Sequence, residues 1–357
     1  MSNSPVAPAK PKSRAWIILK RIGLVIVTLV LAAAAVGVIY QAYGTYRDAR
    51  KYPQEGRSFD LGPDFGNESL NMNCSGQGSP TVIMDTGHGV PAVGWDFVQP
   101  EVAKFTRVCS YDRAGYGWSS PGPMPRTSLQ VAKELHALLA VSGEKGPYVL
   151  VAHSLGGYNV RVFTGQYPAD VAGLVLVDTS HEDQISRMPP ALRQTMTKVD
   201  KDLEQQRKLF PLLLFFGIAR WGIEREKFPG LSDEYQEKVR YLQLQTKYID
   251  ASASEIENFD ESAKEVHAAG NLGDRPLVVL TAGKNPDAKD LPKGVSMKDM
   301  EDFHEVWVND LQVQEMHLST KGKRVLVSDS THMIPFERPD TIITAIREVC
   351  DAVKNKQ

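Results

Sequence analysis

The chain has 357 residues, of which 42% are hydrophobic and 24% are charged, and its formal net charge is -2. This length and composition suit one membrane segment followed by one large globular domain. A near-neutral charge argues against a general nucleic-acid-binding protein, which would carry a strongly basic face, so we expect no nucleic-acid partner.

The first predicted element is a membrane-spanning helix. Residues Ile22 to Tyr40 are almost continuously apolar, and at about 1.5 Å per residue such a helix crosses the roughly 30 Å hydrocarbon layer of a bilayer. We therefore assign residues 22–43 to a transmembrane signal anchor, residues 1–21 to a basic tail and residues 44–57 to a linker. The flanking charged residues are Lys10, Lys12, Arg14, Lys20 and Arg21 before the run, and Arg47, Arg50 and Lys51 after it, partly offset by Asp48.

This charge bias predicts the orientation of the helix. The excess of cations before the apolar run places the N-terminus in the cytoplasm and the globular part in the periplasm or outside the cell. A cleaved signal peptide is the alternative, but the run is longer than the usual apolar region of about 7–15 residues and no clear Ala-x-Ala cleavage site follows it. We expect a single-pass membrane protein and leave open whether the anchor is cleaved.

Beyond the linker, short apolar runs alternate with amphipathic helical patterns. A weaker hairpin-like pair, 58–61 and 69–73, opens the series. Strands that are buried on both faces and joined by helices indicate an α/β fold with a mainly parallel sheet. The later predicted strands are Thr81–Met84, Arg107–Tyr111, Tyr148–Ala152, Gly173–Val177, Leu277–Thr281 and Arg324–Val327, and the helices are Ser128–Val141, Leu155–Tyr167 and Asp340–Val353.

One segment, residues 181–273, interrupts this alternation. It contains no convincing strand and is rich in Gln, Glu, Lys and Leu. Because it lies between the sixth and seventh strands, it can cover the carboxyl ends of the sheet, where α/β proteins bind ligands. We predict a helical cap inserted between two parts of the core, residues 58–180 and 274–357.

The cap contains a strongly apolar stretch, residues 210–218, which is too short to span a bilayer. In one interpretation Phe210, Leu213 and Phe216 line an acyl-binding tunnel. In a second, the stretch dips into the membrane surface. Packing of a cap helix against the main domain is the third interpretation and the commoner arrangement.

The segment Ala152-His153-Ser154-Leu155-Gly156-Gly157 is typical of a nucleophile elbow. An apolar strand leads into Ser154, and the small residues Ala152 and Gly156 leave room for a sharp turn. The following helix offers N–H groups, the Leu155 N–H first, to a developing oxyanion. The alternative is a serine that merely caps that helix.

A serine hydroxyl is a weak nucleophile unless a base removes its proton. His332 lies between the last predicted strand and the final helix, in a loop that returns to the carboxyl edge of the sheet above Ser154. A second oxyanion donor is also needed. The turn Gly87-His88-Gly89-Val90-Pro91 follows the strand 81–84, and we expect it to aim the Val90 N–H into the site.

Two carboxylates compete for the role of orienting His332. Asp178 ends the apolar strand 173–177, where a carboxylate needs a partner. Asp287 follows the next strand in a loop rich in Lys and Asp that is typical of a solvated turn, and Asp290 is a weaker third candidate. Because of this solvated loop we favour Asp178 and keep Asp287 as the alternative acid. The carboxylate without this role would cap a turn or helix.

Taken together, these motifs resemble the α/β-hydrolase superfamily, in its branch with a helical cap after the sixth strand. The elbow, the His88-Gly89-Val90-Pro91 turn, the loop 111–119 and Thr331-His332 occur in the expected order. The resemblance implies an eight-stranded sheet, a Ser-His-acid triad and an acyl-enzyme mechanism. Epoxide hydrolases and haloalkane dehalogenases share the turn but use an aspartate nucleophile where this chain has Ser154, which disfavours both activities. Members place the acid after either strand, so the resemblance does not decide between Asp178 and Asp287.

We expect a membrane-anchored serine hydrolase that cleaves a carboxylic ester of a hydrophobic or lipid-like small molecule. His332 would take the Ser154 proton, while the Leu155 and Val90 N–H groups hold the oxyanion. An aminopeptidase or amidase, an acyltransferase and a non-catalytic binding protein of the same fold are the alternatives. We predict no cofactor and no metal, since His181-Glu182-Asp183 lacks a second group of ligands.

In this fold Cys74 lies on the second strand and Cys109 on the fourth, and these strands are neighbours in the sheet. An exported domain would let the two thiols oxidise to a disulfide. Two buried thiols that act as small hydrophobic side chains are the equally open alternative.

Overall fold

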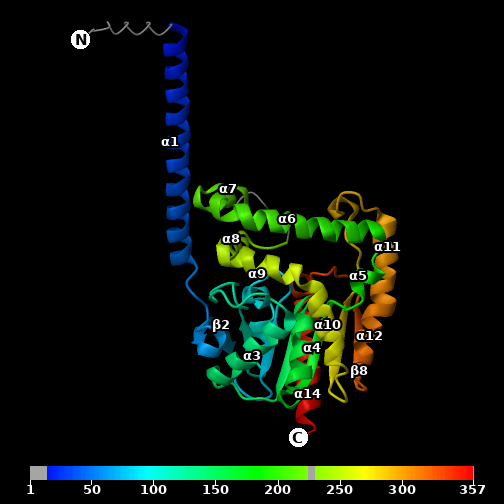
Figure 1. Ribbon diagram of the computed structural model, residues 1–357. Helices are drawn as coiled ribbons and strands as arrows, with labels where there is room; N and C mark the ends of the chain where they lie inside the picture. Colours follow the sequence, from blue (N-terminus) through cyan, green and yellow to red (C-terminus); the bar gives the residue numbers. More distant parts are fainter. Residues whose placement is uncertain (1–13, 224–229, 357) are drawn as a thin grey trace, which may run out of the picture.

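The computed structural model describes residues 14–223 and 230–356. Its centre is an eight-stranded sheet in the order β1-β2-β4-β3-β5-β6-β7-β8 (Figure 1). Strand β2 runs antiparallel to both of its neighbours, and all the pairs from β4 to β8 are parallel. The prediction of a mainly parallel sheet is therefore confirmed, although the sheet as a whole is mixed. The strands are β1 (Arg57–Asp60), β2 (Ser69–Ser75), β3 (Val82–Asp85), β4 (Val108–Tyr111), β5 (Tyr148–His153), β6 (Val171–Val177), β7 (Leu277–Ala282) and β8 (Gly322–Val327).

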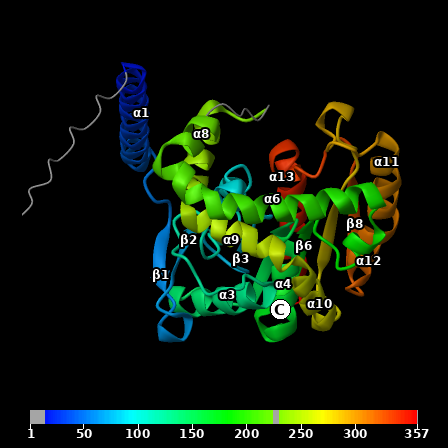
Figure 2. The same cartoon turned by 45° about the horizontal axis from the view of Figure 1, so that its top comes forward.

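Helices cover both faces of the sheet (Figure 2). The faces can both be buried because side chains alternate along each strand: in β5, Leu150 joins one apolar core and Val149 and Val151 join the other. The first core lies under α3 (Ser128–Ser142), α4 (Gly156–Gln166) and α10 (Phe259–Ala269), and the second under α2 (Gln99–Val102), α13 (Ile334–Glu337) and α14 (Pro339–Lys354).

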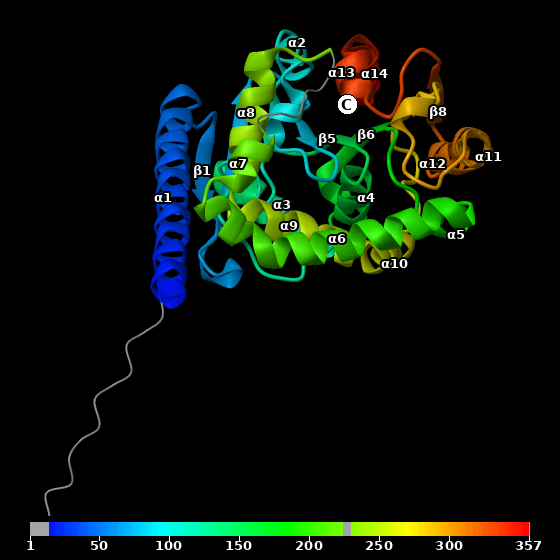
Figure 3. The same ribbon diagram turned by 90° about the horizontal axis from the view of Figure 1, so that it is seen from above.

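The described part of the segment predicted as a cap consists of helices joined by short loops. Its longest helix lies on the side of the sheet where the strands have their carboxyl ends and packs on the cap helix below it. Seen from above, it runs to one side of β5 and β6 (Figure 3). The cap helices are α5 (Gln184–Arg187), α6 (Pro190–Phe215), α7 (Ile218–Ile223), α8 (Asp233–Gln243) and α9 (Thr246–Glu257), with α10 leading back to the core.

A second insertion, between β7 and β8, was not predicted. It consists of α11 (Met297–Val306), a π-helical turn η5 (Trp307–Leu311) and α12 (Gln312–His317). It was missed because the preceding Lys- and Asp-rich stretch is typical of a solvated loop. Short 3-10 turns complete the fold at Pro63–Phe65, Ala92–Trp95, Pro168–Asp170 and Ala288–Asp290.

The N-terminal helix α1 (Arg14–Lys51) is longer than the predicted anchor. It continues through residues 44–51, which we expected to form a linker, because one face of this part packs against α7 and buries Gly44 and Asp48. Residues 1–13 of the predicted tail lie outside the described residues. By length and composition α1 is able to cross a membrane.

The register between β2 and β4 places Cys74 directly opposite Cys109, and the structure joins them in a disulfide with a Cα–Cα distance of 4.1 Å. Of the two outcomes considered for these thiols, the structure therefore has the oxidised one. The free cysteine among the described residues is Cys350, which is buried in α14.

Removing this cross-link is expected to destabilise the fold. The disulfide closes a loop with a sequence separation of 35, and the chain-entropy relation gives a loss of about 4 kcal/mol in the free energy of unfolding for the double variant Cys74→Ala/Cys109→Ala. The measurement is urea unfolding of the full chain in detergent, followed by tryptophan fluorescence. Cys350→Ala is the matched control, since it removes a buried thiol without a cross-link, and equal losses in the two variants would contradict the prediction.

Candidate active site

Ser154 stands at the sharp turn between β5 and α4. Its backbone has φ 53°, in the left-handed region that residues other than glycine rarely adopt. The turn is tight enough that a Cβ added at Gly156 would lie 2.7 Å from the Thr86 carbonyl oxygen, so only glycine fits there. These features are those expected of the elbow.

Ser154, His332 and Asp178 form one chain of hydrogen bonds. His332 Nε2 lies 3.0 Å from Ser154 Oγ, and His332 Nδ1 lies 2.7 Å from Asp178 Oδ2. Asp178 also has a left-handed backbone, with φ 44°. Among the described non-glycine residues only three have positive φ, and two of them belong to this chain of hydrogen bonds, which fits the tendency of backbone strain to gather at functional sites.

The Asp178 carboxylate is buried and fully engaged. Its Oδ1 accepts hydrogen bonds from the Ala282 N–H and from Trp307 Nε1, each at 2.9 Å, while Oδ2 faces His332. Burial by itself would raise the pKa of Asp178, but the hydrogen bond and charge of His332, together with these N–H donors, lower it below its ordinary value. The carboxylate therefore stays ionised and holds the imidazole in one orientation.

The structure does not bring Asp287 to His332. The Asp287 side chain is 59% exposed, and its nearest charged partner is Lys289, whose Nζ lies 3.7 Å from the carboxylate. The Asp287 backbone caps the 3-10 turn that follows it. The side chain of Asp290, our third candidate acid, lies outside the described ones.

Of the two predicted oxyanion donors, Leu155 directly follows Ser154 and Val90 belongs to the turn that begins at Gly87. Leu155 precedes the first residue of α4, so its N–H lies at the N-terminal end of that helix. The turn at residues 87–90 passes beside the serine, since a Cβ added at Gly87 would lie 3.0 Å from Ser154 Cβ. Within this turn the Val90 N–H donates a long hydrogen bond of 3.4 Å to the Gly87 carbonyl oxygen.

His153 is a contributor that the sequence analysis did not identify. Its Nε2–H donates to the His332 carbonyl oxygen at 2.8 Å, and the two imidazole rings lie 4.7 Å apart. Burial, reinforced by the neighbouring His332, lowers the pKa of His153 to about 3, so the ring is neutral at physiological pH. His153 thus fixes the backbone of His332 without adding a competing charge, and its place in the elbow motif was the available clue.

A buried ionic cluster joins the cap to the turn beside Ser154. The Arg113 guanidinium contacts Asp85 and Glu255, each at 2.7 Å, and donates to the carbonyl oxygens of Thr86 and Gly87. Tyr116 Oη donates to Glu255 at 2.6 Å. Since Glu255 lies on α9, this cluster fixes the cap to the turn, and nothing in the sequence singled out Glu255 among the many acids of the cap.

A cleft of about 240 Å³ opens above Ser154 and His332. Its apolar walls come from Met188, Met300, Phe303 and Trp307, so the unpredicted helix α11 supplies much of the site. The three residues suggested as a tunnel do not line this cleft. Phe210 and Leu213 lie on α6 and Phe216 caps its C-terminal end, where the chain packs against α1.

The acids near His181 are held together by an arginine. Glu182, Glu315 and His181 lie close enough for their ligand atoms to share a metal ion. Arg161 Nη1, however, already contacts Glu182 at 2.6 Å and Glu315 at 2.7 Å. The guanidinium supplies the positive charge that these buried carboxylates need, so the group is better described as an ion-pair cluster than as a metal centre.

We predict that the Arg113–Glu255 contact is important for stability. Glu255→Ala should lower the free energy of unfolding by about 3–5 kcal/mol, because it leaves the buried Arg113 with one carboxylate partner fewer. The control is Glu261→Ala, which removes the exposed contact to Lys264 on α10 and should leave stability nearly unchanged. Urea unfolding measures both variants, and a similar effect of the two would show that the buried contact has no special role.

Comparison with known proteins agrees with this geometry. A family model described as "Alpha/beta hydrolase family" matches residues 86–345. The uncharacterised protein YqjL of Bacillus subtilis is 31% identical over 276 residues, which cover 77% of this chain and 85% of that protein. The probable transporter efuK of Hormonema carpetanum is 24% identical over 319 residues, which cover 82% of this chain but only 43% of that protein's length.

Solved structures share the fold. A thermophilic esterase from Thermogutta terrifontis superposes with a TM-score of 0.57 at 22% identity, covering 84% of this chain and 99% of the esterase. A putative α/β hydrolase from Nostoc superposes with a TM-score of 0.63 at 17% identity, covering 83% and 97%. With the matched family model and the confirmed eight-stranded sheet, these findings show that the chain belongs to the α/β-hydrolase family.

Proposed function

We propose that this protein is a serine hydrolase that cleaves carboxylic esters. The observation that carries the proposal is the hydrogen-bonded chain from Ser154 through His332 to Asp178, all three of which line the cleft. A surface serine or a helix-capping serine does not need a histidine that is itself held by a buried carboxylate. The proposal assigns the role of acid to Asp178 and not to Asp287.

The mechanism follows from these contacts. As Ser154 Oγ attacks the ester carbonyl, its proton passes to His332 Nε2, and Asp178 stabilises the resulting imidazolium. The oxyanion is held by N–H groups beside the elbow, for which we propose Leu155 and Val90. The alcohol leaves with the proton from His332. Water that is activated by the same imidazole then releases the acid from the acyl-enzyme.

The cleft has apolar walls beside polar groups such as Lys284, which suits an ester with an apolar part. The side chains of Met188, Met300 and Phe303 offer apolar walls, and such walls bind acyl chains or small hydrophobic alcohols. An aminopeptidase would need a free acid to hold the substrate amine. The acid that lines this cleft is Asp178, and both of its oxygens are already engaged, so an ester is favoured over an N-terminal amine.

We also propose that α1 anchors this hydrolase in a membrane, with the globular domain outside the cytoplasm. Its length and apolar composition support the first part. The cation bias around the helix and the Cys74–Cys109 disulfide support the second, because disulfides persist in oxidising compartments.

The first test separates the two candidate acids. Ser154→Ala should abolish hydrolysis of p-nitrophenyl butyrate, and Asp178→Asn should lower kcat about 10⁴-fold because the imidazole loses its charged partner. Asp287→Asn is the matched control and should keep wild-type kcat, since Asp287 is exposed and remote from His332. The assignment of the acid fails if Asp287→Asn is the variant that loses activity.

The second test concerns Trp307, which both lines the cleft and donates to Asp178. Trp307→Phe keeps an aromatic wall but removes the N–H, so kcat should fall roughly tenfold with little change in KM. Phe303→Leu is the control, because Phe303 lines the cleft without contacting Asp178, and it should change KM more than kcat. If Trp307→Phe altered KM alone, the residue would be part of the wall and nothing more.

A further inference from the structure

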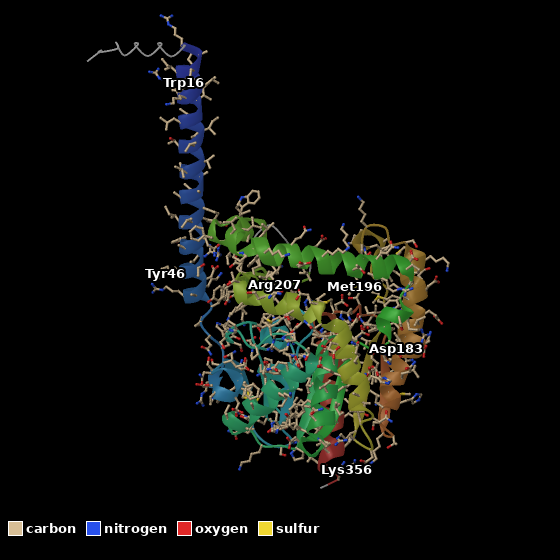
Figure 4. The ribbon with its side chains drawn as sticks, viewed as in Figure 1. Trp16, Tyr46, Asp183, Met196, Arg207 and Lys356 are labelled. Carbon is tan, nitrogen blue, oxygen red and sulfur yellow. A yellow bond between two sulfur atoms is a disulfide. The ribbon has the colours of Figure 1, made fainter. Side chains whose placement is uncertain are left out.

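The C-terminal end of α6 and the start of α7 carry an exposed apolar stripe. Its members recur every third residue, and each is between 53% and 58% exposed. On α6 this spacing keeps the side chains on one face of the helix. The opposite face is held to the rest of the cap, for example through Arg207 and Asp250 (Figure 4). The stripe consists of Leu209, Leu212, Phe215 and Ile218.

The stripe is fixed beside α1. A Cβ added at Gly37 would overlap the Phe216 carbonyl oxygen, so the corner between α6 and α7 rests directly on the α1 backbone. Two turns further along the same face, a Cβ added at Gly44 would lie 2.6 Å from the Arg220 guanidinium. The small residues of α1 therefore form the surface that receives this corner.

A buried ion pair holds the two helices together. Arg220 Nη1 lies 2.5 Å from Asp48 Oδ2, and both side chains are almost completely buried. Arg220 Nε donates to Gln41 at 3.2 Å. These contacts fix the orientation of α1 relative to the cap, so the position of one determines the position of the other. Figures 1 and 4 show α1 rising beside the corner, with Trp16 and Tyr46 toward its opposite ends.

The contact at Gly37 fixes the level of the stripe relative to a bilayer. Gly37 belongs to the apolar run Ile22–Tyr40 and lies close to its end. The exposed side chains of Tyr43 and Tyr46 follow this run, as is typical of the boundary between a membrane and water. A helix that crosses the bilayer through this run brings the corner between α6 and α7 to that boundary.

We propose that the stripe of Leu209, Leu212, Phe215 and Ile218 is a membrane-binding surface whose partner is the lipid of the bilayer that α1 crosses. Its side chains enter the interface between headgroups and acyl chains on the side of the globular domain, as the apolar face of a monotopic helix does. Lipid is the occupant because the stripe spans the corner that rests on Gly37, inside the apolar run of α1. A second protein would have to share this position with the bilayer itself.

This surface also indicates how a substrate reaches the cleft. This inference about the substrate rests on the proposed hydrolase function. Met188 lines the cleft, and α6 begins shortly after it, at Pro190, and ends at the membrane corner. A single helix thus connects the rim of the cleft with the lipid interface. The substrate class that matches this arrangement is an amphiphilic ester that partitions into the bilayer.

The test uses the full chain in phosphatidylcholine vesicles, with a fluorescent NBD label on single introduced cysteines. Leu212→Cys and Phe215→Cys report on the stripe, and Val30→Cys reports on the middle of α1. Val141→Cys on α3 is the matched control, since Val141 is an exposed apolar residue of the core domain. The parent chain measures background labelling at the buried Cys350. Vesicles made with brominated lipid quench labels that contact acyl chains, and hydrolysis of p-nitrophenyl butyrate is measured in the same samples.

We expect the labels at positions 212, 215 and 30 to lose more than half of their fluorescence and the label at position 141 to keep its full fluorescence. Quenching at position 30 without quenching at positions 212 and 215 overturns the proposal of a membrane-binding surface but supports α1 as a membrane anchor. A blue shift without quenching at 212 and 215 also overturns it, because protein would then cover the stripe. Absence of quenching at position 30 as well overturns both the surface and the anchor. Loss of ester hydrolysis in the unmodified parent counts against the proposed function alone.

Discussion

The hydrogen bond between Asp178 and His332 is the contact on which the rest of the site depends. It joins residues 154 positions apart in the sequence, one at the end of β6 and one beyond β8. Burial of a carboxylate is costly unless its oxygens are satisfied, and here Trp307, Ala282 and His332 satisfy both of them. The left-handed backbone of Asp178 and of Ser154 shows that the fold accepts local strain to bring these ends together.

The parallel part of the sheet makes this convergence possible, and the cap segment contributes Met188 to the cleft. Strands β5 and β6 are paired neighbours whose carboxyl ends deliver Ser154 and Asp178 to one edge. The Arg113 cluster ties α9 to the turn at Gly87, which lies beside Ser154. The contacts of Arg220 tie α7 of the cap to α1. The orientation of the cleft is therefore coupled to the orientation of the N-terminal helix.

Much of the fold was predictable from local sequence patterns. The apolar runs located the strands, the Ala152–Gly157 segment located the elbow, and the loop position of His332 placed it above the serine. The parts that were missed depend on contacts between distant segments. Trp307 acts through a π-helical turn in an insertion whose entry looked like a solvated loop, and Glu255 matters only because Arg113 is buried beside it. Residues 44–51 were expected to form a linker because the sequence does not reveal that Arg220 packs against them.

Activation of Ser154 by the Asp178–His332 pair would make this serine react with a fluorophosphonate. The decisive measurement is covalent labelling of the full chain with this reagent, with the modified residue located by mass spectrometry. We expect one adduct, on Ser154, in the wild-type protein and none in His332→Ala at the same reagent concentration. Folded wild-type protein that stays unlabelled, or that carries its adduct on another residue, would contradict the claim and favour a binding protein built on the hydrolase fold.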